Sequence, residues 1–229
     1  MSASARVELN YALESAIEVA IAHRRPLAIV FFIDPKYKAA NERSFRFMLE
    51  GLLVVQKSLK RRGLRLLLKY AGEHQSLPER VIQFAEHVQA SLLVMDVGYS
   101  PVARIWRSQV RKALTCRDTA ILEVEDLAFI PTKLVSQTSV PSAKALRERQ
   151  RPHMDRFAAV ICPDRIENRD IEALKCPEAE EDPSVNWSLE EASDVNVILK
   201  HIAARVGHSF WTVASSSGMK GGTIEAKKY

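Results

Sequence analysis

The residues best suited to bind a ligand lie where predicted strands end. Asp34 follows the apolar run 27–33, and Asp96 follows the apolar run 92–95 and precedes Gly98 and Tyr99. In parallel α/β sheets, ligands bind outside the carboxyl ends of the strands. A carboxylate there acts as a general base or binds a ribose hydroxyl. The alternative, which such positions favour, is that it hydrogen-bonds the following turn. Asp34, Asp96, Gly98 and Tyr99 are therefore the candidate cofactor-binding residues.

A second group of residues points to nucleic acid. Lys144, Arg147, Arg149 and Arg151 fall within or just after a short predicted helix at 143–150. Lysine and arginine bind DNA by neutralising its phosphates. The formal net charge of +5 suits such a partner without requiring one. These four residues are the candidate DNA contacts.

Motifs for several common chemistries are absent from the sequence. It contains no GxGxxG, no GxxxxGK[ST], no CxxC, and no pair of histidines four residues apart. We therefore predict no metal site and assign no catalytic residue. The sparse Cys116, Cys162 and Cys176 are typical of a reducing compartment, which predicts a cytoplasmic protein. No apolar run reaches about 18 residues, so we expect no membrane partner.

Hydrophobic periodicity predicts the elements that position these groups. Strands are expected at 27–33, 64–70, 92–95 and 120–124, and helices at 4–24, 41–62, 77–89 and 101–114. We expect Ser2 or Ser4 to cap the first helix, and Ile105 and Trp106 to lie on the buried face of the fourth. Strands that alternate with helices predict an α/β fold with a parallel, doubly wound, Rossmann-like sheet flanked by helices. The strand at 27–33 should be covered on both faces, and the strand at 92–95 should be a short buried strand.

The pattern changes after residue 131. Residues 132–150 are polar, the stretch around 180–182 is acidic, and a further helix is expected at 193–204. We predict an α/β domain at 1–131, an irregular linker at 132–183, and a few helices at 184–229 that begin another domain.

Several strings resemble segments of class II DNA photolyases. N-E-R-S-F-R-F-M-L-E-G-L at 41–52 resembles the family's R-x-Y-x-F-M-L-x-G-L, and D-V-G-Y at 96–99 with W-R at 106–107 resembles D-x-G-Y…W-R. M-S-A-S-A-R followed by N-Y-A-L at 10–13 resembles M-x-x-x-x-R…N-x-A-L. Arg151 and Pro152 resemble the R-P-K of the interdomain segment, and G-G-T-I-E-A at 221–226 resembles G-G-x-x-E-A. Their order spans almost the whole chain.

The resemblance implies light-driven repair of cyclobutane pyrimidine dimers in DNA by reduced FAD. It also implies an N-terminal α/β antenna domain, with deazaflavin or folate as antenna chromophore, and a C-terminal helical domain. In the family, FAD and the flipped dimer bind the helical domain, which would begin where this sequence ends. The resemblance thus implies damaged DNA as partner, no FAD site in this chain, and no repair by this chain alone. A separate chain carrying the helical domain is a further expected partner.

Two departures from the family are visible. Relatives have an apolar strand before the first helix, whereas Met1 aligns with the residue that follows it, and Ser136 to Pro141 interrupt the family's S-x-K-x-E-Y segment. A natural truncation, a degraded gene, a misassigned start codon or a split reading frame each account for this pattern. If the first strand is missing, a gap should separate the strands at 27–33 and 92–95. The alternative functions are a stand-alone α/β module that binds a nucleotide-like or deazaflavin chromophore and a DNA-binding accessory.

Overall fold

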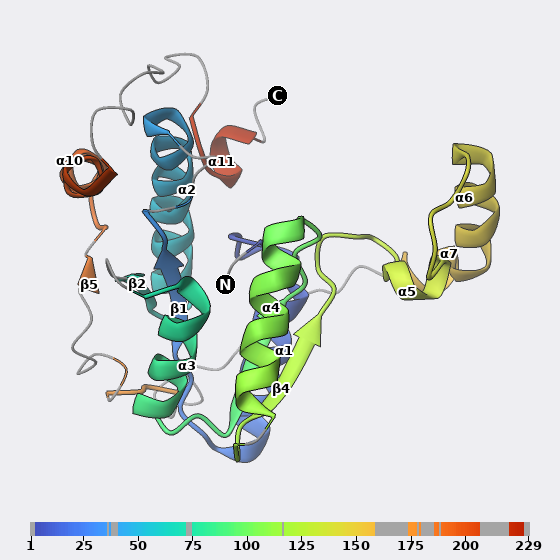
Figure 1. Ribbon diagram of the computed structural model, residues 1–229, viewed down its shortest axis with the longest axis horizontal. Helices are drawn as coiled ribbons and strands as arrows, with labels where there is room; N and C mark the ends of the chain where they lie inside the picture. The colour runs from blue at the N-terminus through green and yellow to red at the C-terminus, as the bar shows by residue number, and fades with distance from the viewer. Residues whose placement is uncertain are drawn as a thin grey trace.

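Strands and helices alternate along the chain from residue 11 to residue 124 (Figure 1). The computed structural model describes residues 3–35, 37, 41–71, 75–115, 117–158, 174–177, 179, 186–187, 189–206 and 220–226. The alternating elements are α1 (Tyr11–His23), β1 (Ile29–Ile33), α2 (Glu42–Arg61), β2 (Leu66–Tyr70), α3 (Leu77–His87), β3 (Leu92–Asp96), α4 (Pro101–Leu114) and β4 (Ala120–Val124). The predicted α/β class is confirmed, and the predicted bounds of α4 and β4 agree with the structure.

One half of the sheet is built from β1 and β2. These strands pair in parallel, with Ile29 opposite Leu66 and Ile33 opposite Tyr70. Helices α1, α2 and α10 (Ala192–Val206) supply the main core against them. Figure 1 shows α10 beside α2, and these two helices are in contact. The core of this half therefore joins residues from both ends of the sequence.

The other half of the sheet is built from β3 and β4. They also pair in parallel, with Leu92 opposite Ala120 and Asp96 opposite Val124, and α1 lies against both strands. The residues of β3 before Asp96 are only half-buried. The expectation that this strand is buried is therefore wrong for the residues before Asp96. The reason is that the position next to β3, on the side away from β4, is a cavity.

Among the described residues, β1 and β3 belong to two different sheets. The space between them is a cavity of about 1320 Å³ lined by every residue of both strands. The strand order is therefore β2–β1, then an open position, then β3–β4. This is a doubly wound order in which no strand of the described residues lies between β1 and β3, so the predicted gap between these two strands is present in the described part of the chain.

The first helix begins later than the sequence suggested. Asn10 is its N-cap and accepts a hydrogen bond from the backbone N–H of Leu13 at 2.9 Å, so α1 starts at Tyr11 rather than at Ser4. Ser4 does not cap the helix, and Ser2 lies outside the described residues. An asparagine side chain in an extended N-cap residue satisfies a helix N–H that would otherwise be unpaired.

The segments after β4 fall into two groups. Helices α5 (Thr132–Val135), α6 (Ala143–Gln150), η1 (Arg151–His153) and α7 (Met154–Phe157) lie apart from the rest of the molecule in Figure 1. In contrast, β5 (Asn186–Trp187) pairs antiparallel with β2, and α11 (Thr223–Ala226) lies against α2. The predicted helix at 143–150 is confirmed. The division into domains at 131 and 183 stays a prediction.

Candidate functional site

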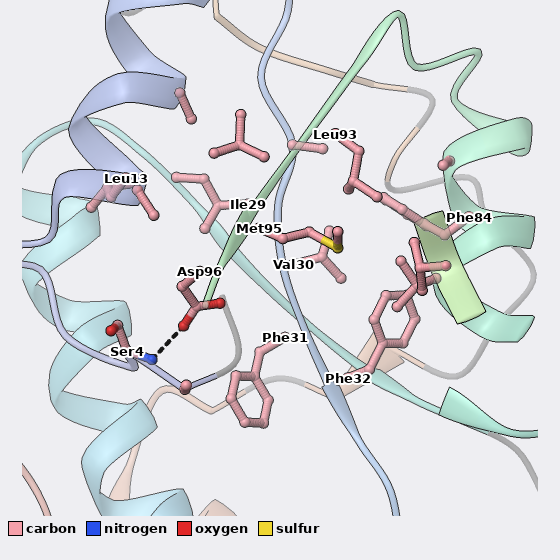
Figure 2. A pocket seen from close by; sticks show the side chains of 18 of the residues that line it. Ser4, Leu13, Ile29, Val30, Phe31, Phe32, Phe84, Leu93, Met95 and Asp96 are labelled. Atoms are coloured by element: carbon pink, nitrogen blue, oxygen red, sulfur yellow. Dashed lines mark hydrogen bonds between the residues drawn. The ribbon is translucent and has the colours of Figure 1, made fainter. Parts of the chain in front are cut away.

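Asp96 ends β3 and holds the beginning of the chain at the carboxyl end of that strand. Its carboxylate is buried and accepts a hydrogen bond from the backbone N–H of Ser4 (Figure 2). The Nδ2 of Asn10 donates to the carbonyl oxygens of Ser4 at 3.0 Å and Arg6 at 2.8 Å. Asp96 therefore has a structural role. It hydrogen-bonds a segment that is distant in the sequence, whereas the structural role considered from the sequence was a hydrogen bond to the following turn.

A buried carboxylate at Asp126 fixes the same segment from the other side. Its side chain is fully buried and forms an ion pair at 2.9 Å with Arg6, whose side chain is 32% exposed. Its Oδ1 also accepts from the backbone N–H of Tyr11 at 2.8 Å. Arg6 donates in addition to the carbonyl oxygen of Asp126 at 2.8 Å. Arg6 and Asn10, which belong to the first string that resembles the family, therefore hold the N-terminal segment in its folded position.

Gly98 lies where two segments approach closely. A Cβ at this position would lie 2.7 Å from the Cβ of Ala103 and 3.4 Å from that of Ala3. The Nη1 of Arg107 donates to the carbonyl oxygen of Gly98 at 3.1 Å, and its Nε lies 3.4 Å from the Glu123 carboxylate. The glycine and arginine of the D-V-G-Y…W-R string thus shape the turn between β3 and α4.

Tyr99 is the candidate residue with a perturbed acidity. Its hydroxyl donates to Glu125 Oε1 at 3.4 Å, and the hydroxyl of Thr132 donates to the same oxygen. Burial, together with the negative charge of Glu125, raises the pKa of Tyr99 above its usual value of 10.0. At neutral pH the phenol therefore stays protonated and can donate a hydrogen bond.

The structure brings the four candidate cofactor-binding residues to one cavity. Asp34, Asp96, Gly98 and Tyr99 all line the space between β1 and β3, at its carboxyl end. Trp106 also lines this space and makes an edge-on ring contact with Tyr37 at 6.2 Å between centroids. Figure 2 shows how apolar side chains such as Phe31 and Met95 make up the walls beyond Asp96. The cavity is therefore mostly apolar, with its polar candidates gathered at the carboxyl end.

The candidate DNA contacts lie elsewhere. Lys144, Arg147 and Arg149 are exposed on α6, and Arg151 is exposed just after it. Arg149 donates to the hydroxyl of Ser136 at 2.6 Å. Because α6 stands apart from the sheet in Figure 1, these residues do not join the cavity.

Sequence reasoning missed a contact between two of the family-like segments. The backbone N–H of Gly221 donates to Glu50 Oε2 at 2.9 Å, and a Cβ on Gly221 would lie 1.9 Å from the carbonyl oxygen of Phe47. It also missed Lys69, a fully buried cation in β2 whose Nζ lies 5.3 Å from the centre of the Phe84 ring. The family resemblance of the strings at 41–52 and 221–226 was a signal for the contact between Glu50 and Gly221. The lysine in L-L-L-K-Y gave no signal for the contact between Lys69 and Phe84.

The described part of the chain shows neither a metal-binding cluster nor a membrane-spanning helix. There, no three histidine, cysteine, aspartate or glutamate side chains group in a way that would hold a metal ion. No helix among these residues has the length and apolar character needed to span a membrane. Cys176 forms no disulfide among the described residues, while Cys116 and Cys162 lie outside them.

The described elements define an α/β protein with parallel strands in doubly wound order. A sequence model of the family described as DNA photolyase matches residues 1–167. The chain is 32% identical over 157 residues to a deoxyribodipyrimidine photo-lyase of Methanothermobacter thermautotrophicus, which covers 69% of this chain and 33% of that protein. The chain belongs to the DNA photolyase family.

A solved structure is also similar to part of the chain. The crystal structure of an archaeal photolyase from Sulfolobus tokodaii with two FAD molecules matches with a TM-score of 0.49 and 19% identity. The match covers 63% of this chain and 32% of that chain. The chain therefore spans about a third of the length of the two photolyases it matches.

The cavity residues fit an aromatic chromophore better than they fit a phosphate-rich cofactor. A volume of about 1320 Å³ exceeds the roughly 300–1,000 Å³ of common small-molecule pockets, so a flat ring system has room. The walls are mostly apolar, and the charged groups at the carboxyl end include the carboxylates of Asp34 and Asp96. These two carboxylates disfavour a phosphate beside them, and Arg107, which also lines the cavity, already contacts the carbonyl oxygen of Gly98 and the carboxylate of Glu123. Tyr99 donates its own proton to Glu125, and its oxygen can accept a hydrogen bond from a ring N–H.

Proposed function

We propose that this chain is the N-terminal α/β part of a class II-type photolyase, which repairs cyclobutane pyrimidine dimers in DNA with light and FAD. The match of the family over residues 1–167 is the observation that carries this proposal. The order of the class II-like strings supports the finer class assignment. The contact between Glu50 and Gly221 adds support, because it joins two of these strings in space.

The proposed part does not repair DNA by itself. The resemblance places FAD in a helical domain beyond these residues, and the chain spans about a third of the relatives it matches. FAD, when bound, supplies the light-driven electron for dimer splitting. The residues of this chain would instead hold the α/β domain against the helical domain, with α11 seated on α2 at the point where the two domains meet.

A light-dependent repair assay tests this proposal. DNA that contains cyclobutane pyrimidine dimers is illuminated with FAD and the purified chain, with and without a separately expressed helical domain of a class II photolyase. We expect no repair by the chain alone, and faster repair by the two parts together than by the helical domain alone. The control is the chain with Gly221→Ala, which disturbs the contact between α11 and α2. Repair by the chain alone, or no benefit from adding it, would contradict the proposal.

A second candidate function is chromophore binding at the cavity. It is favoured by one observation, namely that Asp34, Asp96, Gly98 and Tyr99 line the same cavity. A deazaflavin, folate or nucleotide-like chromophore would place its ring between the apolar walls and donate a hydrogen bond from a ring N–H to the Tyr99 oxygen, whose own proton is donated to Glu125. Calorimetry with each compound and visible absorbance of the purified protein are the measurements. Tyr99→Phe should weaken binding about tenfold, whereas the control Tyr11→Phe, outside the cavity, should not. A colourless protein that binds none of these compounds would end this idea.

The exposed cations of α6 support a role in binding DNA. If Arg147, Arg149 and Arg151 each contact one phosphate, their replacement by glutamine should lower the slope of log affinity against log salt by about 2.7. Fluorescence anisotropy with duplex DNA at several salt concentrations measures this slope. Replacing Arg104, Arg111 and Lys112, three exposed cations of α4, by glutamine is the matched control. Equal losses in the two triple variants would show that only net charge matters.

A further inference from the structure

A second, smaller cavity lies at the amino end of β1 and β2, at the opposite end of β1 from Asp34. Its volume is about 390 Å³, which falls within the roughly 300–1,000 Å³ of small-molecule pockets. It is lined by residues that precede or begin these two strands and by the segment around Leu174. The backbone N–H of Leu27 donates to the carbonyl oxygen of Leu174 at 2.8 Å, so this segment is fixed beside the start of β1.

The floor of this smaller cavity is apolar. The lining residues that are at most 7% exposed are Ile29, Leu64, Leu67, Leu174 and Ala179. They come from both apolar cores of the protein, the one formed with α1 and α2 and the one formed with α3. The apolar part of a ligand that covers this floor leaves water, and the gain is proportional to the apolar area that is removed from water.

The mouth of the smaller cavity is basic. Arg65 and Lys175 line the cavity and are exposed, in contrast to its buried floor. No aspartate or glutamate is among the described residues that line it. An arginine has five N–H donors and a lysine has three, so each side chain can hold an anion in addition to its other contacts. The lining therefore favours a negatively charged group at the solvent side of the cavity.

The end of α2 acts against an anion at this place. Gly63, which follows the C-cap of α2, lines the cavity, and a helix C-terminus carries roughly half a negative charge. Arg65 and Lys175 each carry a full positive charge. Because the Coulomb energy is proportional to charge, two full positive charges outweigh half a negative charge at a similar distance. The net field at the mouth thus attracts anions.

We propose that the smaller cavity binds a small amphiphilic anion. The apolar body of this ligand covers the buried floor, and its carboxylate or phosphate head lies beside Arg65 and Lys175. The site is separate from the space between β1 and β3, because Arg65 and Lys175 do not line that space. The proposal goes beyond DNA repair and does not depend on it.

Calorimetric titration of the full chain with four simple probes tests the proposal. The probes are octanoate, octyl phosphate, octanol and octylamine, which share one apolar chain and differ in the head group. We expect saturable binding of an anionic probe, and binding of octanol and octylamine that is at least about tenfold weaker. The tighter of the two anions identifies the head group. Added salt should weaken the binding of the anions and leave that of octanol unchanged.

Two matched double variants connect this affinity with the smaller cavity. Arg65→Gln with Lys175→Gln removes the cations of the mouth, whereas Lys60→Gln with Arg61→Gln removes two exposed cations of α2 that do not line the cavity. We expect the first variant to bind the tighter anion at least about tenfold more weakly and to bind octanol as before. The second variant should bind both as before. Circular dichroism checks that both variants are folded.

Hydrogen exchange of the unmodified chain locates the ligand, and it decides the question if the first double variant does not fold. The bound anion should slow exchange at the backbone amides of residues 63–67 and 174–176. Exchange in β3, which lines the space between β1 and β3 and not the smaller cavity, should not change.

Four results would overturn the proposal. They are an absence of saturable binding of both anions, equally tight binding of octanol or octylamine, equal losses of affinity in the two double variants, and protection of β3 in place of residues 63–67.

Discussion

Replacing Arg6 by methionine removes the cation that faces a fully buried carboxylate. The side chain of Asp126 has no exposed surface, and its ion pair with Arg6 measures 2.9 Å. Removing one partner of a buried ion pair costs about 3–5 kcal/mol of folding free energy, because a charge stays buried without compensation. Here Arg6 is 32% exposed and Asp126 keeps the N–H of Tyr11, so the loss should be smaller. We expect Arg6→Met to lower the free energy of unfolding by about 2–3 kcal/mol.

Urea denaturation followed by circular dichroism measures this loss, and thermal unfolding should show a midpoint lower by about 4–12 °C. The matched control is Arg111→Met. Arg111 is 60% exposed and lies 4.0 Å from Glu123, so its loss should cost less than about 1 kcal/mol. The double variant Arg6→Met with Asp126→Asn should be more stable than the sum of the single losses predicts, because no buried charge remains. Equal costs for the two arginine variants, or additive losses in the double variant, would refute this reasoning.

Two further predictions concern the contact of α11 with α2 and the acidity of Tyr99. Gly221→Ala should speed hydrogen exchange in α11, because its methyl group would meet the carbonyl oxygen of Phe47, whereas Gly51→Ala should be tolerated since its nearest neighbour would lie at 3.6 Å. Gly51→Ala should even stabilise α2 by up to about 1 kcal/mol. The raised pKa of Tyr99 means that its contribution to stability is present below pH 10 and is lost as the pH rises through the folded-state value. Unfolding measured from pH 9 to pH 12 should show a weaker loss in Tyr99→Phe, and an unchanged profile would show that this tyrosine is not the cause.

The helices and strands of the α/β part could be predicted from the sequence because each carries a strong local signal. The N-caps and apolar stripes of α2, α3 and α4 fix their positions, and short apolar runs fix β1 to β4. The start of α1 was misjudged because small residues such as Ser4 have helical periodicity, while the cap at Asn10 depends on a folded N-terminal segment. Ile105 was expected to be buried and is 57% exposed, since periodicity places it on an apolar stripe but cannot show which part of that stripe another element covers.

The candidate site could be predicted only in part, and the reason is a different one. The rule that ligands bind at the carboxyl ends of parallel strands brought Asp34 and Asp96 to the same cavity, because that rule depends on topology alone. The partners of Asp96 and Gly98 were not readable, because they come from residues 3 and 4, which are distant in sequence. Likewise, β5 has only two residues, and no local sequence pattern predicts that it pairs with β2.

The residues that reveal the family are therefore largely residues that hold the fold together. Asp96 accepts a hydrogen bond from the backbone N–H of Ser4, Gly98 lies close to Ala3, and Glu50 accepts a hydrogen bond from the N–H of Gly221. Each contact joins segments far apart in the sequence, so each constrains residue type wherever the same fold is built, whether or not a reaction takes place there. Membership of the photolyase family rests on the family match over residues 1–167, whereas these contacts say nothing about a repair reaction, which is a separate proposal with its own test.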